Sequence, residues 1–389
     1  MRVNHLLFAL ATAGFTALAA DSPDFTLHEW GTFTSVSGSD GVLLPGLQGE
    51  EERLPGFVFQ HDGMPPMPKG YARPLHNVTI KMETPVIYFY AKEPFKAHVR
   101  VGFNGGSISQ WFPERSGGET PPPAPLLKMF GATGGDIDFA KNYQGSIEWN
   151  VQVQPPSPDD SAAIFKPGET PTWLYPRQPD SSLVRTADGA AEKFLFYRGV
   201  GNFPLPVKFT LPEDNLLHLK NLSSETIPSV LVFNLPGDGD KVSFTLLDPL
   251  KAGEGRTVKL AEPVSSKNWE HEVYAVMRGA LIQAGLFPKE ADAMLQTWWR
   301  SYFEHPGLRA FWIVPQKVAT GILPLTVDPA PGKQVRVLVG RSELLTPAFE
   351  RELVKKIALT ENNPFAYDRY FTSYQARVNS LAAQRPGHP

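Results

Sequence analysis

Two glutamates and one arginine are the strongest candidates for chemical activity in this sequence, because each lies among apolar residues of a predicted strand. Successive side chains of a strand point to opposite faces. In the stretch FTLHEWGTFTSV, Glu29 therefore shares a face with Leu27 and Phe33. The same alternation places Glu83 on the apolar face of KMETPVIYFY and Arg198 on the apolar face of KFLFYRGV. A carboxylate in such a place needs a partner, a shifted pKa or access to water.

Two interpretations of these three residues stay open. The arginine fork binds carboxylates bidentately, so we expect Arg198 to contact Glu29 or Glu83. The group could be a buried ion pair that fixes the register between sheets. It could instead line a polar cleft in which Glu29 and Glu83 act as an acid/base pair and Arg198 lowers the pKa of one. Glycoside hydrolysis needs two such carboxylates, about 5 to 10 Å apart, with one protonated. A single β-bulge would change either assignment of faces.

The stretch SIEWNVQV provides an internal comparison. There Glu148 alternates with Ile147, Trp149 and Val151, so its side chain is expected to face water.

The opposite face of the first strand carries a candidate binding pair, His28 and Trp30. On an open sheet face, an aromatic ring next to a histidine could stack against a sugar ring. The alternative is that both side chains pack beneath a neighbouring segment, as aromatic residues commonly do.

Candidate metal ligands cluster in the stretch HDGMPPMPKG, where His61, Met64 and Met67 follow one another at three-residue spacing. Imidazole and thioether groups suit copper. The alternative is a proline-rich loop whose methionines fill gaps in packing. The sequence has no HExxH zinc pattern, GxSxG elbow, P-loop or strand-linked GxGxxG, and therefore no signature of a known mechanism.

The elements that must position these residues fall into three segments. Strand patterns at 78–90, 97–103 and 146–153, separated by proline-rich loops, predict a β-rich domain over residues 21–203. About five short strands at regular spacing predict a small Ig-like antiparallel sandwich over residues 204–262.

The third segment, residues 263–389, is predicted to be an α+β region, because apolar residues change there from a period of two to 3.6. The fold class is therefore mixed and mainly β. The expected elements are helices at 269–284, 288–303, 347–358 and 366–383, with strands at 310–314 and 334–339.

Composition and termini indicate the compartment. Residues 1–20 combine Arg2, an apolar stretch and a small-residue site at Ala17–Ala19, which predicts a signal peptide and a periplasmic or extracellular bacterial protein. The chain has no cysteine, so disulfides and thiol catalysis are excluded. A net charge of −3 without a basic run argues against a nucleic-acid partner. No second apolar stretch is long enough for a transmembrane segment.

Several distinctive segments together resemble a group of secreted bacterial proteins without an assigned activity. The segments are LHEWGTFTSV, KMETPVIYFY, FLFYRGVGNFPLP, TWWRSYFEHPGLRAFWIVPQ and ILPLTVDPAPGKQVRVLVGRSELLTP. The resemblance supplies no catalytic residue. The leading hypothesis is therefore a secreted hydrolase-like protein that acts on a glycan or another polar polymer. The alternatives are a non-catalytic binding or envelope-assembly protein and a periplasmic copper-binding protein.

Overall fold

The computed structural model describes most of the chain. The described residues are 23–47, 49, 54–60, 75–119, 137–140, 143–166, 168, 170–237, 241–357, 359, 363–365 and 368–384. Strands account for 42% of the structure and helices for 23%, which confirms the mainly β fold class.

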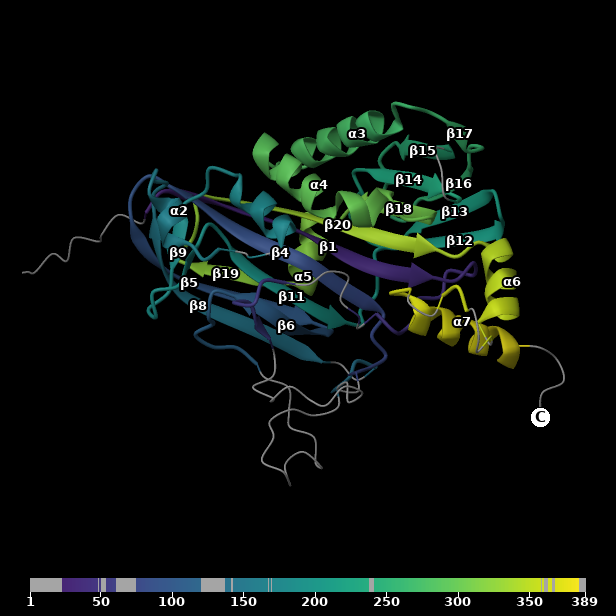
Figure 1. Cartoon of the computed structure of the whole chain (residues 1–389), viewed down its shortest axis with the longest axis horizontal. Helices are drawn as coiled ribbons and strands as arrows, with labels where there is room; N and C mark the ends of the chain where they lie inside the picture. Colours follow the sequence, from purple (N-terminus) through teal and green to yellow (C-terminus); the bar gives the residue numbers. More distant parts are fainter. Residues whose placement is uncertain are drawn as a thin grey trace, which may run out of the picture.

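A ten-stranded sheet runs through the middle of the molecule (Figure 1). Its order is β17 (Val264–Ser265), β15 (Lys241–Leu247), β14 (Val230–Leu235), β18 (Gly307–Ile313), β20 (Lys333–Leu344), β1 (Phe25–Ser37), β4 (Ile80–Ala91), β11 (Leu195–Gly201), β6 (Gly106–Phe112) and β2 (Phe59–Gln60). The strand β1 lies inside this sheet, parallel to β20 on one side and antiparallel to β4 on the other. Both faces of β1 are therefore covered, and all but one of its residues are buried.

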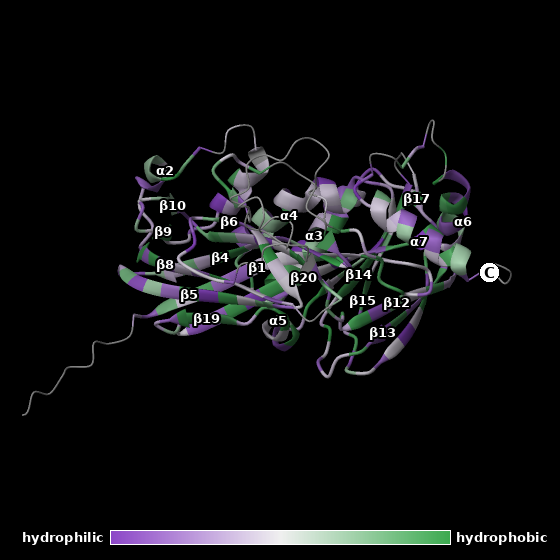
Figure 2. Ribbon diagram, turned by 90° about the horizontal axis from the view of Figure 1, so that it is seen from below, coloured by the Kyte–Doolittle hydropathy of each residue, from purple (hydrophilic) through white to green (hydrophobic). Residues whose placement is uncertain are grey.

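Two smaller sheets cover one face of the ten-stranded sheet (Figure 2). The five-stranded sheet has the order β10 (Ala191–Glu192), β9 (Leu183–Arg185), β8 (Gln144–Gln154), β5 (Phe95–Asn104) and β19 (Leu325–Asp328). The three-stranded sheet consists of β12 (Val207–Glu213), β13 (Leu216–Asn221) and β16 (Gly255–Lys259), and a separate pair joins β3 (Leu75–His76) to β7 (Ile137–Asp138). Residues such as Leu27, Val99 and Phe209 form the apolar core between these layers.

Helices cover the opposite face. The 3-10 helix η1 (Pro171–Arg177) and the helices α3 (Trp269–Gln283) and α4 (Pro288–Phe303) enclose a second core that contains Trp30, Tyr88 and Trp298. A third core at one end of the sheet packs under α6 (Pro347–Lys356) and α7 (Phe371–Ala383). The short helices are α2 (Asp160–Ala163) and α5 (Gln316–Ile322). None of the helices in the described ranges is long and apolar enough to cross a membrane.

The strands predicted for residues 204–262 are all present, and they lie in two layers. The strands β12, β13 and β16 form their own sheet, whereas β14 and β15 belong to the ten-stranded sheet. The reason is that β14 pairs with β18 of the C-terminal region. The ten-stranded sheet thus takes strands from all three predicted segments.

Candidate functional site

Glu29 lies on the apolar face that Leu27 and Phe33 share, as the alternation predicts, and its side chain is fully buried. The carboxylate accepts a 2.6 Å hydrogen bond from the Nε atom of Arg336 and a 2.5 Å hydrogen bond from the Tyr197 hydroxyl. Arg336 is the neighbour of Glu29 in the β1–β20 register. The buried carboxylate is thus held by an adjacent strand, and the hydrogen-bonding arginine is not Arg198.

Glu83 lies on the other face of the sheet, because β4 contains a bulge immediately after it. Thr84 has a left-handed backbone with φ of 44°, and Pro85 has no amide hydrogen to donate to the ladder. The β1–β4 register shifts at this point, and Glu83 pairs with Thr32. The prediction that Glu83 shares a face with Ile87 is therefore wrong.

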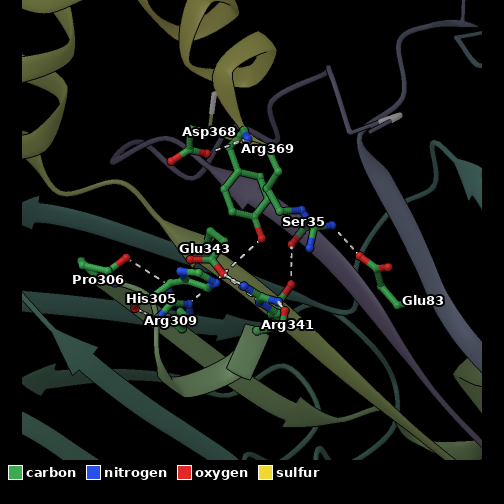
Figure 3. A network of polar contacts seen from close by, with 11 residues as sticks. Ser35, Glu83, His305, Pro306, Arg309, Arg341, Glu343, Asp368 and Arg369 are labelled. Carbon is green, nitrogen blue, oxygen red and sulfur yellow. Dashed lines mark hydrogen bonds and ion pairs between the residues drawn. The ribbon is translucent and has the colours of Figure 1, made fainter. Parts of the chain in front are cut away.

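Glu83 contacts Arg369 on its face of the sheet (Figure 3). Its Oε1 atom accepts a 2.5 Å hydrogen bond from Arg369 of the C-terminal segment. Burial of the carboxyl would raise its pKa, but the charges of Arg369, Arg198 and Lys81 outweigh that effect and lower the pKa of Glu83 to about 2. Arg198 also donates a 3.1 Å hydrogen bond to the Thr84 hydroxyl. A carboxyl group with this pKa is ionised at neutral pH and cannot act as a proton donor.

The predicted acid/base pair therefore does not assemble. Glu29 and Glu83 point to opposite faces of one sheet, both are buried, and each is bound by a different arginine. Arg198 lies on the face of Glu83 and acts on it through its charge. A glycoside-cleaving pair would need both carboxylates on one cleft.

His28 and Trp30 are fully buried, so the sugar-stacking interpretation is wrong, and the structure shows the alternative in which both pack beneath a neighbouring segment. The helix α4 and the residue before it cover this face. The His28 Nδ1 atom is 2.7 Å from Glu290 Oε2, and the imidazole stacks on Phe287 at 4.4 Å. Glu290 also accepts a 2.7 Å hydrogen bond from the Phe287 amide, so one carboxylate joins the start of α4 to β1. Trp30 packs in the core beneath the helices.

A second buried ion cluster lies close to Glu83 and was not expected. Glu343 accepts hydrogen bonds from Arg309 at 2.8 Å and from Arg341 at 2.7 Å, and the Tyr370 hydroxyl lies 3.4 Å away (Figure 3). Burial of Glu343 acts to raise its pKa, but the two arginines lower it overall. The alternation in RVLVGRSEL places Arg341 and Glu343 on the face of Val337 and could have revealed this cluster. Glu343 is thus a third buried carboxylate that arginines hold, after Glu29 and Glu83.

The candidate copper ligands His61, Met64 and Met67 lie outside the described residues. Within the described ranges, no group of three or more His, Cys, Asp or Glu side chains could hold a metal ion.

An accessible candidate site is present on the outer face of the five-stranded sheet, which we call the polar sheet face. Two rows of side chains lie there, each of them across three neighbouring strands. In register, Asp328 lies opposite His98 and His98 opposite Asn150, while Lys96 lies opposite Gln152 and Gln152 opposite Arg185. These six residues line a shallow cavity of about 590 Å³.

The rows arise from the alternation within β5, where Ala97, Val99 and Val101 are buried and Lys96 and His98 reach solvent. The sequence stretch FKAHVRVGFN carries that pattern and could have identified the face. A search that starts from charges on apolar faces overlooks it, because its polar residues occupy ordinary solvent positions.

The hydrogen bonds within the polar sheet face leave many of its donors and acceptors available to a ligand. His98 Nδ1 is 2.9 Å from Asn150 Oδ1, and Gln152 donates to the carbonyl of Phe95 at 3.1 Å. Within the described part of the chain, the side chains of Lys96 and Asp328 make no hydrogen bond. The face therefore offers an ammonium group, a guanidinium group, a carboxylate, two amides and an imidazole to a ligand.

Comparisons with known proteins add little. No family model matches the sequence, and no curated protein matches it. Among solved structures, the yeast delta-COP-I mu-homology domain with a Dsl1 WxWxV peptide aligns with 82% of this chain and 96% of its own chain, at 6% identity and a TM-score of 0.28. The same domain without the peptide gives equal coverage and identity with a TM-score of 0.27. This similarity is too weak to inform fold or function.

Proposed function

We propose that this protein is a non-catalytic glycan-binding protein whose ligand lies across the polar sheet face. The observation that carries the proposal is the pair of opposed rows, Asp328–His98–Asn150 and Lys96–Gln152–Arg185, in one shallow cavity.

Geometry supports a hydroxyl-rich, extended ligand. Adjacent strands are about 4.8 Å apart, and side chains on one face recur about every 6.8 Å along a strand. The two rows thus form a regular array of hydrogen-bond donors and acceptors. The hydroxyl groups of a glycan can form hydrogen bonds with both the neutral and the charged side chains of this array. Lys96 and Arg185 stand at the two ends of one row, which favours a glycan that carries carboxylate groups.

Binding without turnover fits the remaining site better than hydrolysis does. The carboxylates suited to acid/base chemistry, Glu29 and Glu83, are buried and held by Arg336 and Arg369. We place this binding in the periplasm or outside the cell, because residues 1–20 have the pattern of a signal peptide.

A co-sedimentation experiment with insoluble polysaccharides and with peptidoglycan sacculi tests the proposal. The wild-type chain is expected to sediment with at least one of them, more strongly with the carboxylated ones and more weakly as salt is raised. The double substitution Lys96→Ala and Asn150→Ala removes one charged and one neutral contact and should weaken binding about tenfold.

A matched control is available on the other small sheet. Lys208 is an exposed lysine on the outer face of β12, and Lys208→Ala should leave sedimentation unchanged. Wild-type protein that stays in solution with every polymer, or a double variant that binds as well as wild type, contradicts the proposed function.

A further inference from the structure

A second cavity lies apart from the polar sheet face, beside α2 and η1, and shares no lining residue with it. We call it the Phe165 groove after its most exposed apolar residue. Its volume is about 690 Å³, and its walls combine the apolar side chains of Ile164, Phe165 and Leu174 with the cations Lys166 and Lys193. A cavity of this size suits a small molecule.

The apolar wall is exposed although most large apolar side chains of the protein are buried. Phe165 is 51% exposed and Leu174 is 48% exposed, and both line the same groove. The Phe165 ring is held on one side by Phe57 at 5.7 Å and by Phe112 at 6.1 Å. The ring is therefore positioned and still accessible, and adjacent exposed apolar side chains in a groove are typical of ligand sites.

The groove is lined by two lysines and by one carboxylate, Asp160, that have no salt-bridge partner among the described residues. Arg177 forms a salt bridge with Glu192 at 2.6 Å, and Asp180 forms one with Lys289 at 2.7 Å. The charges of Arg177 and Asp180 are therefore largely neutralised by these partners. Lys166 and Lys193 form no salt bridge with any described residue.

Lys193 is the more informative of the two lysines. Its ammonium donates a 2.6 Å hydrogen bond to the carbonyl of Pro179, and the side chain is half-buried. Burial lowers the pKa of Lys193, although Asp180 and Asp160 oppose that shift. A partly desolvated ammonium group that lacks a carboxylate contact gains free energy from an anion beside it.

We propose that the Phe165 groove binds a small amphipathic anion, with an apolar ring against Phe165 and Leu174 and an acidic group on Lys193. Charge complementarity and the half-exposed aromatic wall carry this assignment. The site is independent of the proposed glycan binding.

Two dyes of the same shape separate the apolar contribution from the charge. The probe 8-anilinonaphthalene-1-sulfonate carries a sulfonate, whereas N-phenyl-1-naphthylamine has the same rings without it. Fluorescence titration of the full chain should show binding of both. Lys193→Met should weaken the sulfonate dye about tenfold and change the neutral dye less than about twofold. Phe165→Ser should weaken both dyes.

Leu246→Ser is the matched control, since Leu246 is 47% exposed on β15, away from the groove, and its loss should change neither titration. Lys193→Arg retains the charge and should bind the sulfonate dye within about threefold of wild type, which keeps the test informative if Lys193→Met melts early. The proposal is overturned if wild type binds neither dye, if Lys193→Met leaves the sulfonate dye unaffected, or if Phe165→Ser leaves both unaffected.

Discussion

At the scale of single residues, Glu29, Glu83 and Glu148 show how the surroundings of a glutamate in a strand decide its role. Glu148 keeps 25% of its side chain exposed and pairs with Arg100 at the surface, as the alternation predicts. Glu29 and Glu83 are buried, and they form ion pairs with Arg336 and Arg369, respectively. Exposed ion pairs contribute up to about 1 kcal/mol to the free energy of unfolding, whereas removing one partner of a buried pair costs about 3 to 5 kcal/mol.

Arg369→Met should therefore destabilise the protein by about 3 kcal/mol, because Glu83 stays buried and loses its hydrogen bond. The measurement is urea unfolding at pH 7. Arg100→Met is the matched control at the exposed pair and should cost less than about 1 kcal/mol. Equal losses for the two variants would show that the Glu83 contact is no stronger than a surface pair.

At the scale of elements, local patterns predicted much of the fold. The helices predicted to begin at Trp269 and Pro288 begin there, and the Thr346 hydroxyl accepts a hydrogen bond from the Phe349 amide at the start of α6. These signals work because periodicity and capping depend on neighbouring residues. The proline at position 85 carried the sign of a bulge, since proline within a sheet occurs at bulges and edges.

The partners of the buried charges could not be predicted in the same way. Arg336 lies 307 positions from Glu29, and Arg369 lies 286 positions from Glu83. Only the sheet order and the docking of the C-terminal segment bring these pairs together, and neither follows from local periodicity. For the same reason, local patterns could not show that α4 is the segment that covers His28.

The bulge in β4 also explains the glycine of the HEWGTF stretch. A Cβ atom on Gly31 would lie 2.9 Å from the Cα atom of Pro85 on the neighbouring strand. Backbone cannot move away as a flexible side chain can, so Gly31→Ala should destabilise the protein by about 2 kcal/mol. Thermal and urea unfolding measure this change.

Gly279→Ala provides the control for that substitution. Gly279 is exposed in α3, with no atom within 4 Å of an added Cβ, so alanine should stabilise the helix by up to about 1 kcal/mol. A Gly31→Ala variant as stable as wild type would mean that the two strands are not in close contact at the bulge.

At the scale of the whole molecule, one sheet joins segments that are far apart in sequence. The strand β1 lies beside β20, and the segment that leads into α7 docks on the same sheet through Arg369 and Tyr370 (Figure 1). The buried ion pairs therefore connect the start of the described chain to its end. The two cavities described above lie instead on outer surfaces, at the polar sheet face and the Phe165 groove.

This arrangement makes global stability depend on pH in a defined window. Burial opposes ionisation of Glu83, but Arg369, Arg198 and Lys81 lower its pKa from 4.5 to about 2, and the pKa of Glu343 is lowered in the same direction by Arg309 and Arg341. A carboxyl with a lowered folded-state pKa stabilises the fold above its unfolded pKa. That contribution, about 3 kcal/mol for Glu83, should be lost as pH falls from about 4.5 to about 2.

Urea unfolding of wild type and Glu83→Gln across this range isolates the contribution of one carboxylate. Near pH 7 the variant should be less stable by about 3 kcal/mol, because it lacks the charge that three cations surround. Near pH 2 the two proteins should differ by less than about 1 kcal/mol, since Glu83 is then about half protonated in the folded state and fully protonated in the unfolded state. A difference that stays constant with pH would mean that Glu83 stabilises the sheet by packing and not by its charge.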